Sequence, residues 1–166
     1  MFSLHDIIEI AIKVELNGAR TYREASEKTK DEDLAALLAF LAHDEEDHAR
    51  WFRELGENAP ESKASEEIES MGRAMLRGVV GDKSFSLDDV DLSKAETMAE
   101  VLDAAQELEL DTAMFYQMLG GFIDDPTTLA HLETIIEEEK RHGRFLEEFL
   151  RTGQTPSKQE LEHRPT

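Results

Sequence analysis

The chain has 166 residues, about the length of one domain, with 38 acidic against 18 basic side chains, a formal net charge of −20 and no cysteine. The negative charge argues against nucleic acid or anionic lipid as a partner and favours cations, and the lack of cysteine excludes disulfides, thiolate zinc sites and iron–sulfur clusters. No apolar run approaches the roughly 20 residues of a membrane span, and the first residues lack signal-peptide character, so we expect a soluble, cytoplasmic protein with no membrane partner.

The first predicted element is a helix. The sequence is rich in Ala, Leu, Glu and Lys and has only four Pro, which favours an all-α fold. Ser3 and Asp6 can cap a helix that runs to about Lys28, with apolar residues repeating at helical spacing. Glu15 lies in the middle of that apolar stripe.

A second helix is expected to start near Thr29, because Thr29 and Glu32 form a capping-box pattern. We expect it to end at Leu55, because Gly56 follows. Its apolar stripe is interrupted by two polar residues, Glu45 and His48.

Residues 56–92 break the helical rhythm with several glycines and a proline, although 66–77 has the pattern of a short amphipathic helix. A connection of about 37 residues is a crossover and not a tight turn.

The third helix follows a capping box at Ser93 and Glu96 and carries Glu109 on its apolar face; it is expected to end at Gly120. Asp125 and Pro126 then suit the N-cap and first position of a fourth helix, whose stripe holds Glu139 and His142. After Gly153 the pattern is lost. The sequence thus predicts a helical domain over residues 1–152 and a flexible tail over 153–166.

The same set of polar residues occurs twice. Glu15 lies 30 positions before Glu45, which opens Glu45-x-x-His48, and Glu109 lies 30 positions before Glu139, which opens Glu139-x-x-His142. Each member of the second set lies 94 positions after its counterpart.

The spacing gives this repeat a geometric meaning. In an antiparallel helical hairpin, two residues lie at the same height when the turn falls midway between them. The midpoints are Lys30 and Asp124, and both lie at predicted turns. The three-residue spacing places each Glu and His on one helix face. Two such hairpins joined by a long crossover form a ferritin-like four-helix bundle.

The sequence also contains one Glu-x-x-His motif outside the repeat, which we call the decoy motif. Glu160-x-x-His163 fits the short motif, yet it has Ala130, not Glu, 30 positions upstream and lies outside the patterned helices. A lone core-facing His is more often structural than a ligand. Four Glu that face one core favour a ligand site over a structural role, because burying unpaired carboxylates costs several kcal/mol each.

Two divalent cations would offset that cost, since four carboxylates and two neutral imidazoles balance their charge. Oxygen and imidazole ligands suit Fe or Mn, with Zn as a possible substitute. By symmetry we expect Glu45 and Glu139 to bridge the ions. The terminal ligands would be the pairs Glu15 with His48 and Glu109 with His142.

The segments from Ala11 to Tyr22, Glu45 to His48, Glu109 to Tyr116 and Glu139 to His142 resemble the rubrerythrin and bacterioferritin branch of the ferritin-like superfamily. The resemblance covers residues 5–150. It implies a non-haem centre of two Fe ions that is oxidised by O₂ or hydrogen peroxide, with functions from peroxide reduction to ferroxidase action and iron storage. It also implies a homo-oligomer, with a dimer favoured.

The chain departs from the rubrerythrin pattern in two respects. Rubrerythrins usually carry a rubredoxin-like domain whose iron is bound by Cys, so here a separate electron donor protein is expected. They also carry an additional carboxylate on the third helix, at the position of Thr112 in this chain. The six-ligand set is closer to the bacterioferritin pattern.

Tyr22 and Tyr116 each follow a ligand Glu by seven residues and are also 94 positions apart. Each hydroxyl could donate to a carboxylate on a neighbouring helix and orient it, or each could be a core aromatic with a polar tip. The leading hypothesis is a di-iron oxidoreductase that reduces peroxide or O₂. The alternatives are a ferroxidase or iron-storage protein and a metal-binding module without turnover.

Overall fold

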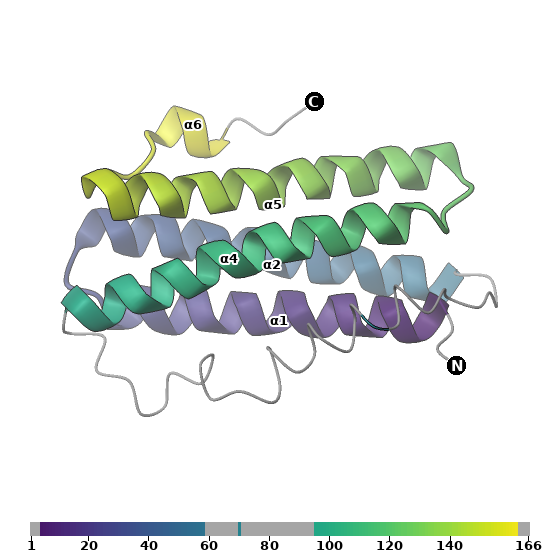
Figure 1. The fold of residues 1–166 in the computed structure, drawn as a ribbon, viewed down its shortest axis with the longest axis horizontal. Coiled ribbons are helices and arrows are strands. Elements are labelled where there is room, and N and C mark those ends of the chain that lie inside the picture. The colour runs from purple at the N-terminus through teal and green to yellow at the C-terminus, as the bar shows by residue number, and fades with distance from the viewer. Residues whose placement is uncertain (1–3, 59–69, 71–94, 163–166) are drawn as a thin grey trace.

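The computed structural model describes residues 4–58, 70 and 95–162. The described residues form helices and no strand, which confirms the all-α prediction. The helices are α1 (Leu4–Lys28), α2 (Glu32–Asn58), α4 (Ala95–Gly120), α5 (Pro126–Thr152) and α6 (Lys158–Glu162). Figure 1 shows the four long helices as two hairpins, α1 with α2 and α4 with α5, that pack into one bundle. The predicted crossover lies almost entirely outside the described residues.

The apolar core has two parts, one toward each end of the bundle. The first includes Ile8 of α1, Phe52 of α2 and Leu132 of α5, all with 0% of their surface exposed. The second contains residues from the opposite ends of the same helices, such as Leu38 of α2 and Leu146 of α5. The polar residues in the middle of the helices therefore lie between two apolar clusters.

The N-cap of helix α2 lies two residues later than the sequence indicated. The N-cap is Asp31, whose carboxylate oxygen accepts the backbone N–H groups of Asp33 and Leu34 at 3.0 Å each. The Thr29 hydroxyl instead accepts the N–H of Asp31 at 3.2 Å. The prediction of a cap at Thr29 was wrong because the nearer carboxylate binds the free N–H groups of the first turn.

Gly56 does not end α2, which continues to Asn58. A Cβ atom at Gly56 would lie 3.2 Å from Cγ2 of Ile8, closer than most side-chain contacts. The glycine therefore allows α1 to approach α2, and the prediction that it terminates the helix was wrong.

Helix α5 has the caps that the sequence predicted. The Asp125 side chain accepts the N–H of Thr128, Pro126 occupies the first turn, and Gly153 adopts the left-handed conformation with φ of 69°.

A short helix follows α5 within the segment that we expected to be flexible. Ser157 and Glu160 form a capping box, in which the Ser157 N–H donates to the Glu160 carboxylate at 2.7 Å. Leu161 packs against the second apolar cluster. Glu160, part of the decoy motif, thus caps α6 and lies away from the bundle interior, while His163 lies outside the described residues.

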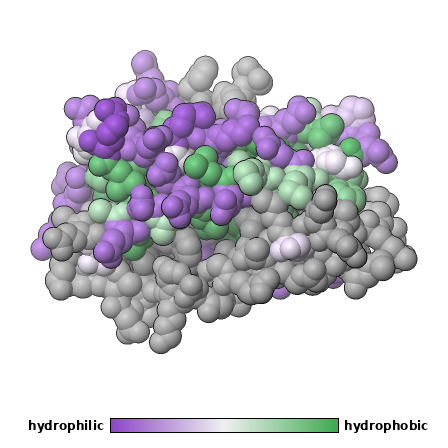
Figure 2. All heavy atoms as spheres, in the orientation of Figure 1, coloured by the Kyte–Doolittle hydropathy of each residue, from purple (hydrophilic) through white to green (hydrophobic). Residues whose placement is uncertain are grey.

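Figure 2 shows hydrophilic side chains over α5, with hydrophobic side chains gathered in a band beside them. Leu110 and Met114 of α4 are among the exposed large apolar residues, with 47% and 54% of their surface exposed. None of the helices that the structure describes combines the length and the apolar character that crossing a membrane requires.

Candidate metal centre

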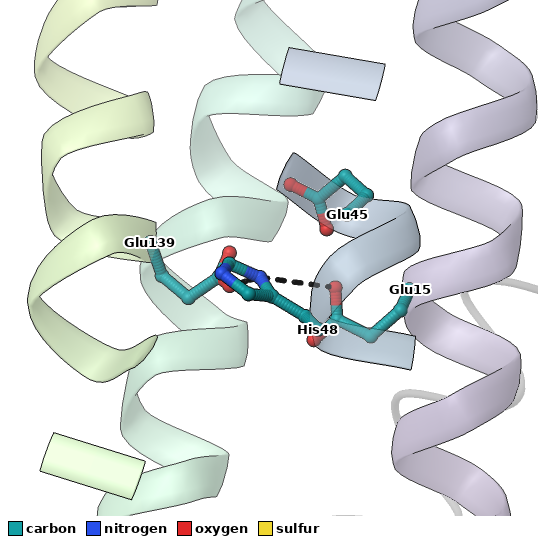
Figure 3. A group of neighbouring side chains, drawn as sticks. All are labelled: Glu15, Glu45, His48 and Glu139. Atoms are coloured by element: carbon teal, nitrogen blue, oxygen red, sulfur yellow. Dashed lines mark ion pairs between the residues drawn. The ribbon is translucent and has the colours of Figure 1, made fainter. Parts of the chain in front are cut away.

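The six residues that the sequence singled out as metal ligands meet in the middle of the bundle. One group consists of Glu15 from α1, Glu45 and His48 from α2, and Glu139 from α5. Each contributes one potential ligand atom, and these atoms lie within 4.8 Å of one another. Figure 3 shows the four side chains pointing toward a common centre from three helices.

A second group adjoins the first. It consists of Glu45, Glu109, Glu139 and His142, with the same limit of 4.8 Å between potential ligand atoms. Glu45 and Glu139 belong to both groups, which is the arrangement expected of two carboxylates that bridge a pair of ions. Glu15 and Glu109 each belong to one group, as do the two histidines.

The groups are shielded from solvent. Glu15, Glu139 and His142 have 0% of their surface exposed, and the remaining members have no more than 4%. Carboxylates at such burial are destabilising unless opposite charge or hydrogen bonds compensate them.

Several atoms at this centre lack a hydrogen-bond partner among the described residues. They are both carboxylate oxygens of Glu139, Oε2 of Glu15 and Nδ1 of His48. His48 Nδ1 lies 2.7 Å from a Glu139 oxygen, an ion-pair distance without hydrogen-bond alignment. Buried polar atoms without partners are uncommon and call for a ligand. Oxygen and imidazole donors around two cations satisfy them, so these residues fit a di-metal site.

The outward nitrogen of each imidazole is held by an acidic residue of the opposite hairpin. Nε2 of His48 lies 3.0 Å from Oε2 of Glu138, and Nε2 of His142 lies 3.3 Å from Oδ2 of Asp44. These contacts leave both Nδ1 atoms facing the centre. A carboxylate on the far nitrogen fixes the orientation of a metal-binding imidazole and raises its basicity.

Sequence analysis did not identify Asp44 and Glu138. A signal was present, because each immediately precedes a shared glutamate and the two are also 94 positions apart. In a chain with 38 acidic residues an adjacent acid attracts little notice. The helix rotation that points these carboxylates across the bundle is visible only in the structure.

Both tyrosines donate to a carboxylate of the other hairpin. The Tyr22 hydroxyl donates to Glu109, and the Tyr116 hydroxyl donates to Glu15. Burial raises the pKa of each tyrosine well above its usual value, and the adjacent carboxylates raise it further. The hydroxyls therefore stay protonated and act as hydrogen-bond donors to the two terminal glutamates.

Without metal, protons take the place of the cations. Burial raises the pKa of Glu45 and Glu139 well above the usual value, and neighbouring carboxylates raise it further. Burial would lower the pKa of His142, but the hydrogen bond to Asp44 and the charge of Glu109 raise it to about 10. Burial would also lower the pKa of His48, but the neighbouring carboxylates raise it well above its usual range. The centre therefore requires positive charge, which protons or metal ions can supply.

The chain matches the sequence model of the rubrerythrin family over residues 6–150. The chain belongs to the rubrerythrin family. A crystal structure of a protein assigned as a ferritin-like diiron-carboxylate protein, from Thermotoga maritima, superposes with a TM-score of 0.73 and 27% identity. The match covers 92% of this chain and 97% of that one. No curated protein matches the chain.

Membership of the rubrerythrin family agrees with the buried cluster of Glu and His as a di-metal site. At the position where rubrerythrins usually have an additional carboxylate, Thr112 is buried beside Glu109, with 3% of its surface exposed. The centre of this chain therefore has six potential ligands and a hydroxyl where a seventh would lie.

We expect Asp44→Asn to weaken the binding of one metal ion by about 10- to 100-fold, because His142 would lose the carboxylate that orients and polarises it. Titration of the metal-free protein in the presence of a competing chelator measures this change. Asp47→Asn is the matched control, since Asp47 contacts the exposed Arg50 at 2.9 Å. Equal affinities for Asp44→Asn and Asp47→Asn would contradict a role for Asp44 at the centre.

Proposed function

We propose that the chain is a non-haem di-iron oxidoreductase that reduces hydrogen peroxide or O₂ at the centre of the bundle. The observation that carries this proposal is the pair of buried ligand groups that share Glu45 and Glu139. Two ions held by common carboxylates can each transfer one electron to the same small substrate, which is the chemistry that the bound metals would supply.

The residues of the chain prepare the centre for this reaction. Glu15 with His48 and Glu109 with His142 would hold one ion each, and the shared glutamates would hold both. Four carboxylates and two neutral imidazoles balance the charge of two divalent ions, so the reduced centre would be neutral inside an apolar bundle. The hydrogen bonds from Tyr22 and Tyr116 keep the terminal carboxylates in place.

We further propose that the metal bound at the centre is iron. Oxygen and imidazole ligands without sulfur suit Fe and Mn, and Zn could occupy the site without redox activity. Since the 166 residues contain no cysteine to bind a second redox centre, we propose that a separate electron donor protein re-reduces the pair.

A second candidate function is ferroxidase action. It is favoured by Thr112, which stands where the family usually has a further carboxylate and leaves a six-ligand set similar to the bacterioferritin pattern. In this case Fe(II) would be the substrate, and turnover would consume many irons per chain.

We expect the protein loaded with Fe(II) to develop near-ultraviolet absorbance on oxidation, and to react faster with hydrogen peroxide than with O₂ at equal concentration. Stopped-flow absorbance with each oxidant measures the two rates. Faster reaction with O₂ and continued oxidation of added Fe(II) would favour the ferroxidase. If the natural chain oxidises Fe(II) no faster than a Glu139→Gln variant with either oxidant, both the oxidoreductase and the ferroxidase proposals are contradicted. The remaining hypothesis would then be a metal-binding module without turnover.

A further inference from the structure

A small cavity adjoins the shared carboxylates. Its volume is about 10 Å³, roughly the space of one water molecule. The polar residues that line it are Thr21, Tyr22, Glu45, Glu109, Thr112 and Glu139. Neither His48 nor His142 is among the lining residues. The cavity therefore leaves space for a water-sized ligand on the carboxylate side of the centre.

Thr21 lines this cavity, and its hydroxyl has no hydrogen-bond partner among the described residues. Thr21 has 2% of its surface exposed, and its Oγ1 atom is fully enclosed. A threonine hydroxyl in a helix can donate to the carbonyl four residues earlier. Thr134 and Thr152 do so, at 3.1 Å from the carbonyl oxygen of Ala130 and 2.7 Å from that of Glu148. Thr21 does not, so its hydrogen is available for a group in the cavity.

Apart from Thr112, the other polar residues of the lining leave this role to Thr21. The Tyr22 hydroxyl already donates to Glu109. With metal bound, the carboxylates of the lining are ionised, so they accept hydrogen bonds and have no hydrogen to donate. A buried polar group without a partner is rare in proteins and calls for a bound water, ion or ligand.

Gly18 keeps the space beside Glu45 open. A Cβ atom at this position would lie 3.5 Å from Cγ and Oε2 of Glu45, in ordinary contact and without a clash. Alanine is therefore sterically acceptable, and it would stabilise the helix relative to glycine. Gly18 also occupies the position that corresponds to Thr112 in the second half of the chain, 94 residues on. Glycine here leaves room that any side chain would fill.

We propose that the Thr21 hydroxyl donates a hydrogen bond to a water-sized ligand of the metal pair, and that Gly18 preserves the space for that ligand. The ligand class is a small hydrogen-bond acceptor, such as water, hydroxide or one oxygen atom of peroxide. The inference rests on the metal pair of the proposed function and assigns Thr21 as a positioning residue on its substrate side.

Fluoride is a suitable probe, because it is a single atom, about the size of water, that accepts hydrogen bonds. We expect Thr21→Val, which removes the hydroxyl and keeps the shape, to weaken fluoride binding to the oxidised iron-loaded protein by about three- to tenfold. Thr21→Ser should bind fluoride as the natural chain does. Gly18→Ala should weaken binding by more than Thr21→Val, because its methyl group takes up the cavity. Titration monitored by near-ultraviolet absorbance gives each dissociation constant.

Thr134→Val is the matched control, since it removes a hydroxyl from α5 that donates to a backbone carbonyl. Metal content is measured first for every variant, and two ions per chain are expected throughout. Unchanged fluoride affinity in Thr21→Val or in Gly18→Ala would overturn the inference, as would a chain that holds two ions and does not bind fluoride. The assay involves no turnover, so slow reaction with peroxide and O₂ would contradict the proposed function alone.

Discussion

Glu139→Gln is expected to lose both metal ions, whereas Glu15→Gln should lose only one. Glu139 belongs to both ligand groups and Glu15 to one. Replacing a carboxylate that merely orients a ligand lowers metal affinity by about 10- to 100-fold, so loss of a shared ligand should exceed about 100-fold for both ions. Metal analysis after equilibrium dialysis should give no ions per chain for Glu139→Gln and one for Glu15→Gln. Equal metal content in the two variants would contradict the sharing of Glu139.

The same substitution should stabilise the metal-free protein at alkaline pH, where Glu139 would otherwise carry a buried negative charge. Burial and neighbouring carboxylates raise the pKa of Glu139 and so disfavour its charged form, whereas glutamine has no charge to bury. Thermal unfolding of the metal-free variant at pH 9 measures this gain, which should be smaller at pH 5.5. Glu160→Gln is the control, because it removes the decoy carboxylate at the cap of α6 and should change neither metal content nor the stability of the bundle.

The metal-free protein should lose stability as the pH rises from about 5 to 9. The pKa values of Glu45, Glu139, His48 and His142 are all raised in the folded state. A group with a raised pKa contributes stability that is complete below its ordinary pKa and is lost as the pH passes through the raised value. For His142 this loss extends to about pH 10.

Among the groups at the metal centre, Glu109 acts in the opposite direction. Burial would raise the pKa of Glu109, but its hydrogen bond with His142 and the charge of that imidazole lower it. Its contribution is therefore present above the ordinary carboxyl pKa and is lost on acidification. Among the glutamates and histidines of the centre, four pKa values are raised and one is lowered. The folded metal-free centre therefore binds more protons than the same groups in the unfolded chain, so its contribution to stability falls as the pH rises.

Urea unfolding at pH 5.5, 7 and 9, with and without bound metal, measures this dependence. The metal-loaded protein has the same surface charge, so it controls for general repulsion among the acidic side chains. Its ligands have already released their protons, and it should be more stable at neutral than at acidic pH. Parallel pH profiles for the two forms would contradict the view that protons replace the cations at the centre.

The repeat in the sequence was enough to locate the candidate centre. Helix periodicity sets the face on which Glu45 and His48 lie, and the midpoint between Glu15 and Glu45 sets their common height, so these positions follow from spacing alone. The two turns lie where the sequence placed them, at residues 29–31 and 121–125.

Features that depend on contacts between helices did not follow from spacing. Gly56 resembled a helix stop because its role depends on the Cγ2 atom of Ile8 in another helix. The contact of Asp44 with His142 and the free hydroxyl of Thr21 depend on side-chain direction across the bundle. The sequence pattern indicated a cap at Thr29, and only the structure shows that Asp31 accepts the N–H groups.

The division of ligands between the hairpins has a consequence for folding. Each hairpin joins neighbouring helices through a short loop and can form early, because its contacts are local. The first ligand group has three residues from the α1–α2 hairpin and only Glu139 from the α4–α5 hairpin. The second group has three residues from the α4–α5 hairpin and only Glu45 from the α1–α2 hairpin. When the hairpins dock, each one therefore contributes one carboxylate to the ligand group of the other. A cation bound to either hairpin would attract the missing ligand, so metal binding would favour docking of the two hairpins.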